Sequence, residues 1–296
     1  MFRFQNEQQV YTIGGVPFGG QPGARRTVLV GSLFYPGHSV VEDRIKGRVK
    51  REALEKMISD HREAMKNTDS PAALMIYAET AESMVSYLDD VSSLSDLPLF
   101  LDSPSPEVKL GGAVKAGEIG LGDRIVYNSL NAGSSADELA RLRDSKIRSA
   151  VLLAFNPRDF GVKGKIYLLE DGGGMLPEGL IDIARKHGID RPLIDLAVMS
   201  VEQNAGSALK ALIVAKAKWG LPSGCALHNA VESWRPVLKA KETDKQLFRY
   251  VDVSSAVIPI MAGADFVIYG PIEYARRVSL AAAFADELVK QSVSDL

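Results

Sequence analysis

The sequence predicts a (β/α)₈ TIM barrel, an α/β fold in which helices surround eight parallel strands. Apolar runs of strand length alternate with helix-like segments along nearly all of the 296 residues, a length that one such barrel with its excursions fills. The runs lack polar–apolar alternation, as expected of strands buried on both faces. Five of them end in Asp or Asn, and strand C-termini converge on the mouth of a barrel. An open doubly wound sheet is the structural alternative, since strand order cannot be read from one sequence.

The elements follow one another in a regular order. Residues 1–24 predict a hairpin that turns at Gly14-Gly15 and covers the N-terminal end of the barrel. Helical periods separate the strands, and several of them end at Gly. Segments 34–47 and 157–176 are interpreted as long loops at the mouth. No linker divides the chain, so we expect one domain over residues 1–296. The predicted strands are 27–34, 72–79, 97–103, 124–130, 149–156, 191–198, 223–229 and 265–271.

Composition excludes several classes of function. A hydrophobic share of 46% supplies a core, and a formal net charge of −2 gives no footprint for nucleic acid. The single cysteine, Cys225, lies in an apolar run and is expected to be a small buried side chain rather than a nucleophile. The N-terminus lacks the apolar core of a signal peptide, and no apolar run approaches the ~20 residues that span a bilayer. These observations predict a soluble, cytoplasmic protein.

The polar residues at the strand ends predict a pocket for a flat heterocycle with an amide-like edge. Asp102 could instead cap the helix that follows it, and each Asn alone could simply form a turn. Asp195 differs, because its apolar run continues beyond it and an unpaired buried carboxylate is costly. Their joint occurrence at the same end of the strands favours a binding role. The five candidates are Asp102, Asn128, Asn156, Asp195 and Asn229.

Other residue types contribute less. His61 and His187 lie on predicted helices and are expected at the surface, whereas His38 could reach the mouth. His228 directly precedes Asn229, so strand alternation would point the two side chains to opposite faces. No cluster suggests a bound metal. Glu79 is the one candidate base at a strand end, and the absence of a strand-end Lys disfavours Schiff-base chemistry.

Several segments together resemble a known family. They are IGGVPFGGQPG, VLVGSLFYPGH, LFLDS, VYNSLNA, LAFNPRD, PLIDLAV, LHNAVESW and FVIYGPIE. In this order they resemble the H subunit of tetrahydromethanopterin S-methyltransferase and its bacterial relatives, which use methyltetrahydrofolate and work beside corrinoid proteins. The resemblance covers essentially the whole chain. The strand-end pattern is more distantly similar to other pterin-binding barrels, the methyltetrahydrofolate:corrinoid methyltransferases and the dihydropteroate synthases.

The resemblance implies a reaction and roles for the candidates. Asp195 would accept the 2-amino and N3–H donors of a pterin, while Asp102 and Asn128 would bind the rest of its edge. Asn229 would lie near N5, the nitrogen that carries the methyl group, whereas Asn156 is assigned to the pocket from its position alone. The implied reaction moves a methyl group between N5 of methyltetrahydrofolate or methyltetrahydromethanopterin and the cobalt of a corrinoid. Because the chain lacks a D-x-H-x-x-G corrinoid motif, the corrinoid would arrive on a partner protein. A homodimer is also implied.

Three alternatives stay open at this point. A dihydropteroate synthase is disfavoured, because Asn229 stands where that family has a strand-seven Lys. A phosphate-binding barrel isomerase or aldolase would depend on Glu79 or on Tyr269-Gly270-Pro271 at strand eight. A non-catalytic scaffold subunit of a corrinoid complex is the third. Folate is preferred modestly over methanopterin, because a free-standing soluble system is expected.

Overall fold

The computed structural model describes residues 3–294 and contains a closed barrel of eight parallel strands. Residues 1–2 and 295–296, the ends of the predicted domain, lie outside the described part. The strands follow chain order around the barrel, and β12 closes it by pairing with β3. The predicted fold is confirmed. The barrel strands are β3 (Val28–Leu33), β6 (Ala72–Tyr77), β7 (Leu99–Asp102), β8 (Ile125–Leu130), β9 (Ser149–Leu153), β10 (Arg191–Asp195), β11 (Ser223–Cys225) and β12 (Phe266–Pro271).

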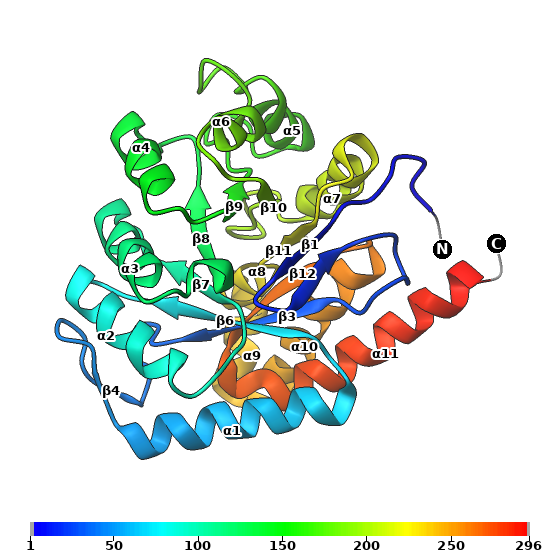
Figure 1. Ribbon diagram of the computed structural model, residues 1–296. Coiled ribbons are helices and arrows are strands. Elements are labelled where there is room, and N and C mark those ends of the chain that lie inside the picture. Colours follow the sequence, from blue (N-terminus) through cyan, green and yellow to red (C-terminus); the bar gives the residue numbers. More distant parts are fainter. Residues whose placement is uncertain (1–2, 295–296) are drawn as a thin grey trace.

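Helices surround these strands (Figure 1), and local sequence signals set their ends. Thr80 and Ser83 form a reciprocal capping box at the start of α2, Pro106 occupies the first turn of α3, and Gly220 ends α7 in the left-handed conformation. The helices are α1 (Arg51–Thr68), α2 (Ala81–Ser92), α3 (Pro106–Glu118), α4 (Ala136–Asp144), α5 (Val162–Glu170), α6 (Leu180–Lys186), α7 (Gly206–Trp219), α8 (His228–Ser233), α9 (Arg235–Thr243), α10 (Lys245–Met261) and α11 (Ala275–Ser294), with 3₁₀ turns η1 (Gly122–Arg124) and η2 (Ile272–Tyr274).

The N-terminal hairpin closes the bottom of the barrel, as predicted. Strands β1 (Val10–Ile13) and β2 (Val16–Gly19) pair antiparallel. Phe18 is fully buried, and its ring lies 6.2 Å from that of Phe100 and 6.4 Å from that of Phe266, measured between centroids. The Gly14 N–H donates to the carbonyl of Asp123 in η1, the 3₁₀ turn that leads into β8. The hairpin therefore seals the end at which the strands begin and leaves the opposite end for a site.

The structure differs from the sequence prediction in the long connections. Segment 157–176, interpreted as a loop, contains α5, whose apolar face buries Ile166, Leu168 and Leu169. Segment 34–47 contributes β4 (Val41–Asp43), which pairs with β5 (Arg48–Val49). The predicted seventh strand is too long, because β11 stops at Cys225 and α8 begins at His228. Between α8 and the last strand lie α9, which was not predicted, and α10, which matches a predicted helical segment. No helix within residues 3–294 is both long and apolar enough to cross a membrane.

Candidate functional site

A pocket of about 260 Å³ opens at the C-terminal ends of the barrel strands. This volume lies just below the ~300–1,000 Å³ of pockets for drug-sized ligands, so it suits a ring system rather than a whole extended molecule. Its wall combines apolar side chains with polar groups from separate strands. The lining residues are Ser32, Met75, Asp102, Asn128, Ser129, Leu153, Asp195, Ala197, Val198, Met199, Ala226, His228, Asn229, Ile268 and Gly270.

Asp195 ends β10 and is buried at the pocket wall. One of its carboxylate oxygens, Oδ1, accepts the N–H of Ala197 at 2.8 Å. Burial raises the pKa of Asp195 to about 6, although the Ala197 N–H and the nearby Lys165 ammonium favour the ionised form. The carboxylate is thus ionised at neutral pH but incompletely solvated, which suits it to accept hydrogen bonds from a ligand.

Asp102 and Asn128 form a second polar pair, across neighbouring strands. Nδ2 of Asn128 donates to Oδ1 of Asp102 at 3.1 Å, and the two residues are paired in the β7–β8 register. Burial raises the pKa of Asp102 to about 6, against the effects of Lys109 and the Asn128 amide. Asp102 does not cap α3, because Ser105 is the N-cap residue of that helix. The pair is left with an ionised oxygen and an amide oxygen, both acceptors.

Two buried lysines lie behind the carboxylates, and the sequence prediction missed both. Nζ of Lys165 donates to the carbonyl of Ala197 at 2.7 Å, while the Ala197 N–H bonds to Asp195. These two bonds hold Ala197 in the left-handed region, at φ +44°. Nζ of Lys109 donates to the carbonyl of Ser129 at 2.8 Å and lies 3.7 Å from Oε1 of Glu138. Burial lowers the pKa of both lysines. The sequence does contain a signal for them: each lysine stands at a position of its helix that faces the core, among apolar residues.

Asn229 and His228 both line the pocket, which corrects the prediction that they face opposite ways. Strand alternation does not apply, because the two residues begin α8 rather than end β11. Asn229 is exposed at the mouth, and its Nδ2 donates to the carbonyl of Val198 at 3.0 Å. His228 is buried, and its Nδ1 lies 2.7 Å from Oδ1 of Asp252. His228 is therefore part of the site, although the sequence analysis predicted that its side chain points away from the pocket.

Asn156 is the one candidate that the structure does not bring to the pocket wall. Its Oδ1 accepts the N–H of Arg158 at 2.9 Å, and its Nδ2 donates to the carbonyl of Gly173 at 3.4 Å. The first bond is a turn formed by an Asn with its own backbone. The side chain therefore ties the start of the β9–α5 connection to the glycine-rich turn that follows α5.

Other sequence candidates lie outside the pocket wall. Glu79 forms an ion pair of 3.3 Å with Arg44. His38 is buried, and its Nδ1 accepts the Phe34 N–H at 2.9 Å. Cys225 is buried as predicted, and burial raises the pKa of its thiol. Among residues 3–294, no group of His, Cys, Asp or Glu is arranged to hold a metal ion.

A larger cavity of about 630 Å³ lies outside the barrel, between α1 and the start of α11. His61 lines it, and the prediction that His61 is a surface residue is wrong, because the side chain is buried. Burial lowers its pKa to about 4, so the ring is neutral at physiological pH. None of the five candidates borders this cavity. The convergence of strand-end groups therefore identifies the smaller pocket as the candidate site.

Comparison with known proteins gives one consistent family. A family model described as "Tetrahydromethanopterin S-methyltransferase MtrH subunit" matches residues 6–296. The H subunit of tetrahydromethanopterin S-methyltransferase from Methanothermobacter marburgensis is 40% identical over 296 residues, which cover 100% of this chain and 96% of that protein. The corresponding protein of Methanococcus maripaludis is 36% identical and covered to the same extent.

Solved structures with a similar fold are dihydropteroate synthases. The Yersinia pestis enzyme with a pterine–sulfa conjugate gives a TM-score of 0.64 at 13% identity, over 97% of this chain and 100% of that chain. The Xanthomonas albilineans enzyme in complex with 7,8-dihydropteroate gives 0.60 at 16% identity, over 97% and 99%. At these identities the likeness establishes the barrel fold alone.

Proposed function

The chain belongs to the MtrH family of methyltransferase subunits, and from this premise we propose that it moves a methyl group between N5 of a methyltetrahydropterin and the cobalt of a corrinoid. A second protein carries the corrinoid, and the reaction is cytoplasmic. The observation that carries the proposal is the pocket itself. Acceptors from β7, β8 and β10 meet there around a space of heterocycle size.

Asp195 recognises the pyrimidine edge of the pterin in this proposal. Its buried carboxylate accepts the 2-amino and N3–H groups, and a carboxylate that accepts two parallel donors is a strong, oriented contact. Asp102 and Asn128, joined by their 3.1 Å hydrogen bond, accept further donors along the ring. The raised pKa values of the two aspartates support this assignment, because ligand donors would supply the solvation that burial has removed.

Asn229 lies beside N5 in the same proposal. The bond to the Val198 carbonyl orients its amide, and its exposure leaves the methyl group open to attack from the mouth. The cobalt, as Co(I), attacks the methyl carbon in an SN2 step, and the electrons of the carbon–nitrogen bond stay on N5. A tertiary amine is a poor leaving group, so N5 must be protonated, and the Asn229 amide stabilises the protonated form.

Exposed apolar residues at the pocket and at the far end of α8, the helix that begins at the pocket, support a docking partner. Met199 is 48% exposed and lines the pocket, and Trp234, directly after α8, is 40% exposed. Large apolar side chains at the rim of a site are typical of a protein interaction surface. A corrinoid domain that covers this rim would bring its cobalt to the methyl group without entering the barrel.

The pterin class is tested by titration with two ligands. Tetrahydrofolate and tetrahydromethanopterin differ in ring methyls and tails, away from the edge that Asp195 binds, so the pocket predicts binding of the shared ring system. Calorimetric titration with methyltetrahydrofolate and with methyltetrahydromethanopterin should give saturable binding for at least one. Of the two methyl carriers, we expect the folate to bind. Failure of both would contradict the proposal.

A homodimer is part of the proposal, and α11 supports it. Leu280, Phe284 and Leu288 are exposed at 67%, 66% and 40%, and their spacing of four residues forms one apolar face. We expect sedimentation equilibrium to give the mass of a dimer, and Phe284→Glu to give that of a monomer. A monomeric wild-type protein would contradict the proposed dimer but would not bear on the proposed reaction.

The alternatives receive less support. None of the residues lining the pocket is Lys or Arg, which disfavours a phosphate ligand there. A purely scaffolding subunit would not need a buried and a half-buried carboxylate, Asp195 and Asp102, at its pocket, because such groups reduce stability when unoccupied.

A further inference from the structure

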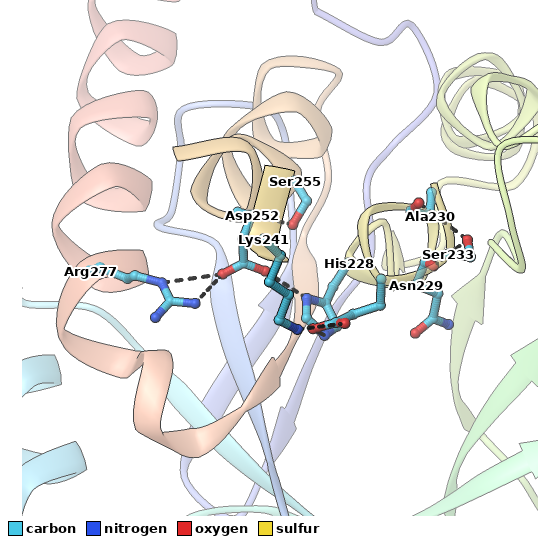
Figure 2. Close-up of polar contacts among 9 residues, drawn as sticks. His228, Asn229, Ala230, Ser233, Lys241, Asp252, Ser255 and Arg277 are labelled. Atoms are coloured by element: carbon cyan, nitrogen blue, oxygen red, sulfur yellow. Dashed lines mark hydrogen bonds and ion pairs between the residues drawn. The ribbon is translucent and has the colours of Figure 1, made fainter. Parts of the chain in front are cut away.

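His228 belongs to a row of polar side chains that runs from the pocket to the outer helices (Figure 2). Its Nδ1 lies 2.7 Å from Oδ1 of Asp252 on α10. The other oxygen of Asp252 accepts hydrogen bonds from Nε of Arg277 on α11, at 3.2 Å, and from its terminal Nη2. Asp252 is 1% exposed. Both carboxylate oxygens are therefore engaged, one by the imidazole and one by the guanidinium.

This arrangement defines the two ring nitrogens of His228. An ionised carboxylate only accepts, so Nδ1 carries a proton directed at Asp252. Nε2 is therefore the ring nitrogen that can exchange a proton with a ligand. The neighbour of Nε2 on β12 is Gly270, where a Cβ would come within 2.5 Å of it. Gly270 also lines the pocket and has φ +86°, so the absence of a side chain there makes room for the imidazole at the wall.

Charges of both signs surround the ring. Glu232 on α8 has Oε1 3.8 Å from Nε2, and its Oε2 is paired with Lys241 of α9 at 3.3 Å. Tyr274 of η2 packs edge-on to the imidazole, and the Arg277 guanidinium lies 3.4 Å from the centre of the Tyr274 ring. Two carboxylates therefore face the imidazole, and each of them is paired with a cation, Asp252 with Arg277 and Glu232 with Lys241.

The proposed reaction needs a proton that no other candidate supplies. The Asn229 amide can stabilise a protonated amine but cannot donate a proton to it. Asp102 and Asp195 lie on β7 and β10, and the proposed contacts engage both with the opposite edge of the ligand. His228 is adjacent to Asn229 and shares its pocket.

We infer that His228, positioned by Asp252 and Arg277, is the acid that protonates N5 of the methylpterin. As Co(I) attacks the methyl carbon, the carbon–nitrogen electrons stay on N5 and Nε2–H delivers a proton to that nitrogen. The products are methyl-Co(III), a pterin with N5–H and neutral His228, which takes a proton from solvent. In the reverse direction neutral His228 removes the N5 proton. This inference rests on the proposed methyl transfer.

The test compares wild type with His228→Gln, using methyltetrahydropterin as ligand and free cob(I)alamin as acceptor. Calorimetry comes first, in two buffers of different ionisation enthalpy at pH 7.5. We expect the wild type to take up protons on binding and the variant to bind within about threefold of the wild type without that uptake. Equal proton uptake by both proteins would overturn the inference, whereas no binding to wild type would instead contradict the proposed function.

Single-turnover transfer gives the second readout, measured between pH 5.5 and 8.5. His228→Gln should transfer about 10²–10⁴-fold more slowly, the range of general acid catalysis, and should lose the decline of the wild-type rate with rising pH. A variant that keeps the wild-type rate and pH profile would overturn the inference. Asp252→Asn should lower the rate and alter the profile without weakening binding, as a positioning residue would. His187→Gln, a half-buried histidine on another face, is the control and should match wild type.

Discussion

The two ends of the barrel show how one strand framework serves two purposes. At the N-terminal end, the hairpin inserts Ile13 and Phe18 into an apolar cluster with the barrel interior. At the C-terminal end, the strands finish in carboxylates and amides, and the pKa values of Asp102 and Asp195 are raised to about 6. Burial of apolar surface stabilises the first end, whereas partly desolvated charge destabilises the second until a ligand supplies donors. Substitutions at the two ends should therefore have opposite effects on stability and binding.

The largest effect is expected at the sealed end. Phe18→Ala removes a fully buried aromatic ring and should lower the free energy of unfolding by about 3–5 kcal/mol. Denaturant titration measures this change, and ligand affinity should stay within about twofold under conditions where the variant is folded. Tyr167→Ala, at a site 46% exposed on α5, is the matched control. A large loss of affinity in Phe18→Ala would contradict the separation of the two ends.

Asn229→Ala tests the reactive side of the pocket. Loss of the amide that the proposal places beside N5 should reduce the rate of methyl transfer by about 10²–10³-fold, while methylpterin affinity falls only a few-fold. Transfer kinetics and calorimetry on the same preparation give both numbers. Equal losses in rate and affinity would assign Asn229 to binding alone.

Asp195→Asn should stabilise the empty protein. Because the folded-state pKa of Asp195 lies above the unfolded value of 3.8, its stabilising contribution is complete below that value and is lost as pH rises through about 6. At neutral pH the ionised carboxylate costs about 2–3 kcal/mol. The neutral amide should remove much of this cost, which thermal denaturation at pH 7.5 can measure. An unchanged or lower Tm would show that the Ala197 N–H and Lys165 already compensate the charge.

The smallest effect is on the pH dependence of binding. Ligand donors need ionised acceptors, so in the His228→Gln variant, which should bind without proton uptake, affinity should be constant above about pH 7 and fall about tenfold per unit below pH 6 for each carboxylate involved. Calorimetry across this range gives the slope, and Asp102→Asn should reduce it while binding persists. An affinity that is flat from pH 7 to pH 5 would exclude both aspartates as acceptors.

Regular burial made the barrel predictable. Each barrel strand is apolar on both faces, and the polar residue that ends a run marks the mouth, so Asp102, Asn128 and Asp195 could be located from the sequence. Asn229 was also located at the mouth, although its predicted strand conformation was wrong. The apolar segment that leads to Asn229 continues past Cys225 through Ala226 and Leu227. Hydrophobic periodicity alone cannot distinguish the end of a short strand from the first turn of a helix in such a segment.

The missed residues belong to connections rather than strands. Helix α5 lies between Gly161 and a glycine-rich turn, so its short apolar face was interpreted as a loop, and Lys165 was overlooked with it. Asp252 lies on α10, a helix that was predicted, but its contact with His228 joins residues 24 apart across three helices. Such pairings depend on tertiary packing, which no local pattern in one sequence reports.

The central claim is that the polar end of the barrel is a methylpterin site built on Asp195. Calorimetric titration of the wild type and Asp195→Ala with methyltetrahydrofolate, and with its methanopterin analogue, tests it most directly. The proposal predicts saturable binding of one ligand to the wild type and a loss of at least about a hundredfold in the variant, because a paired, charge-assisted contact is removed. Undiminished binding to Asp195→Ala, or no binding of either ligand to the wild type, would contradict it.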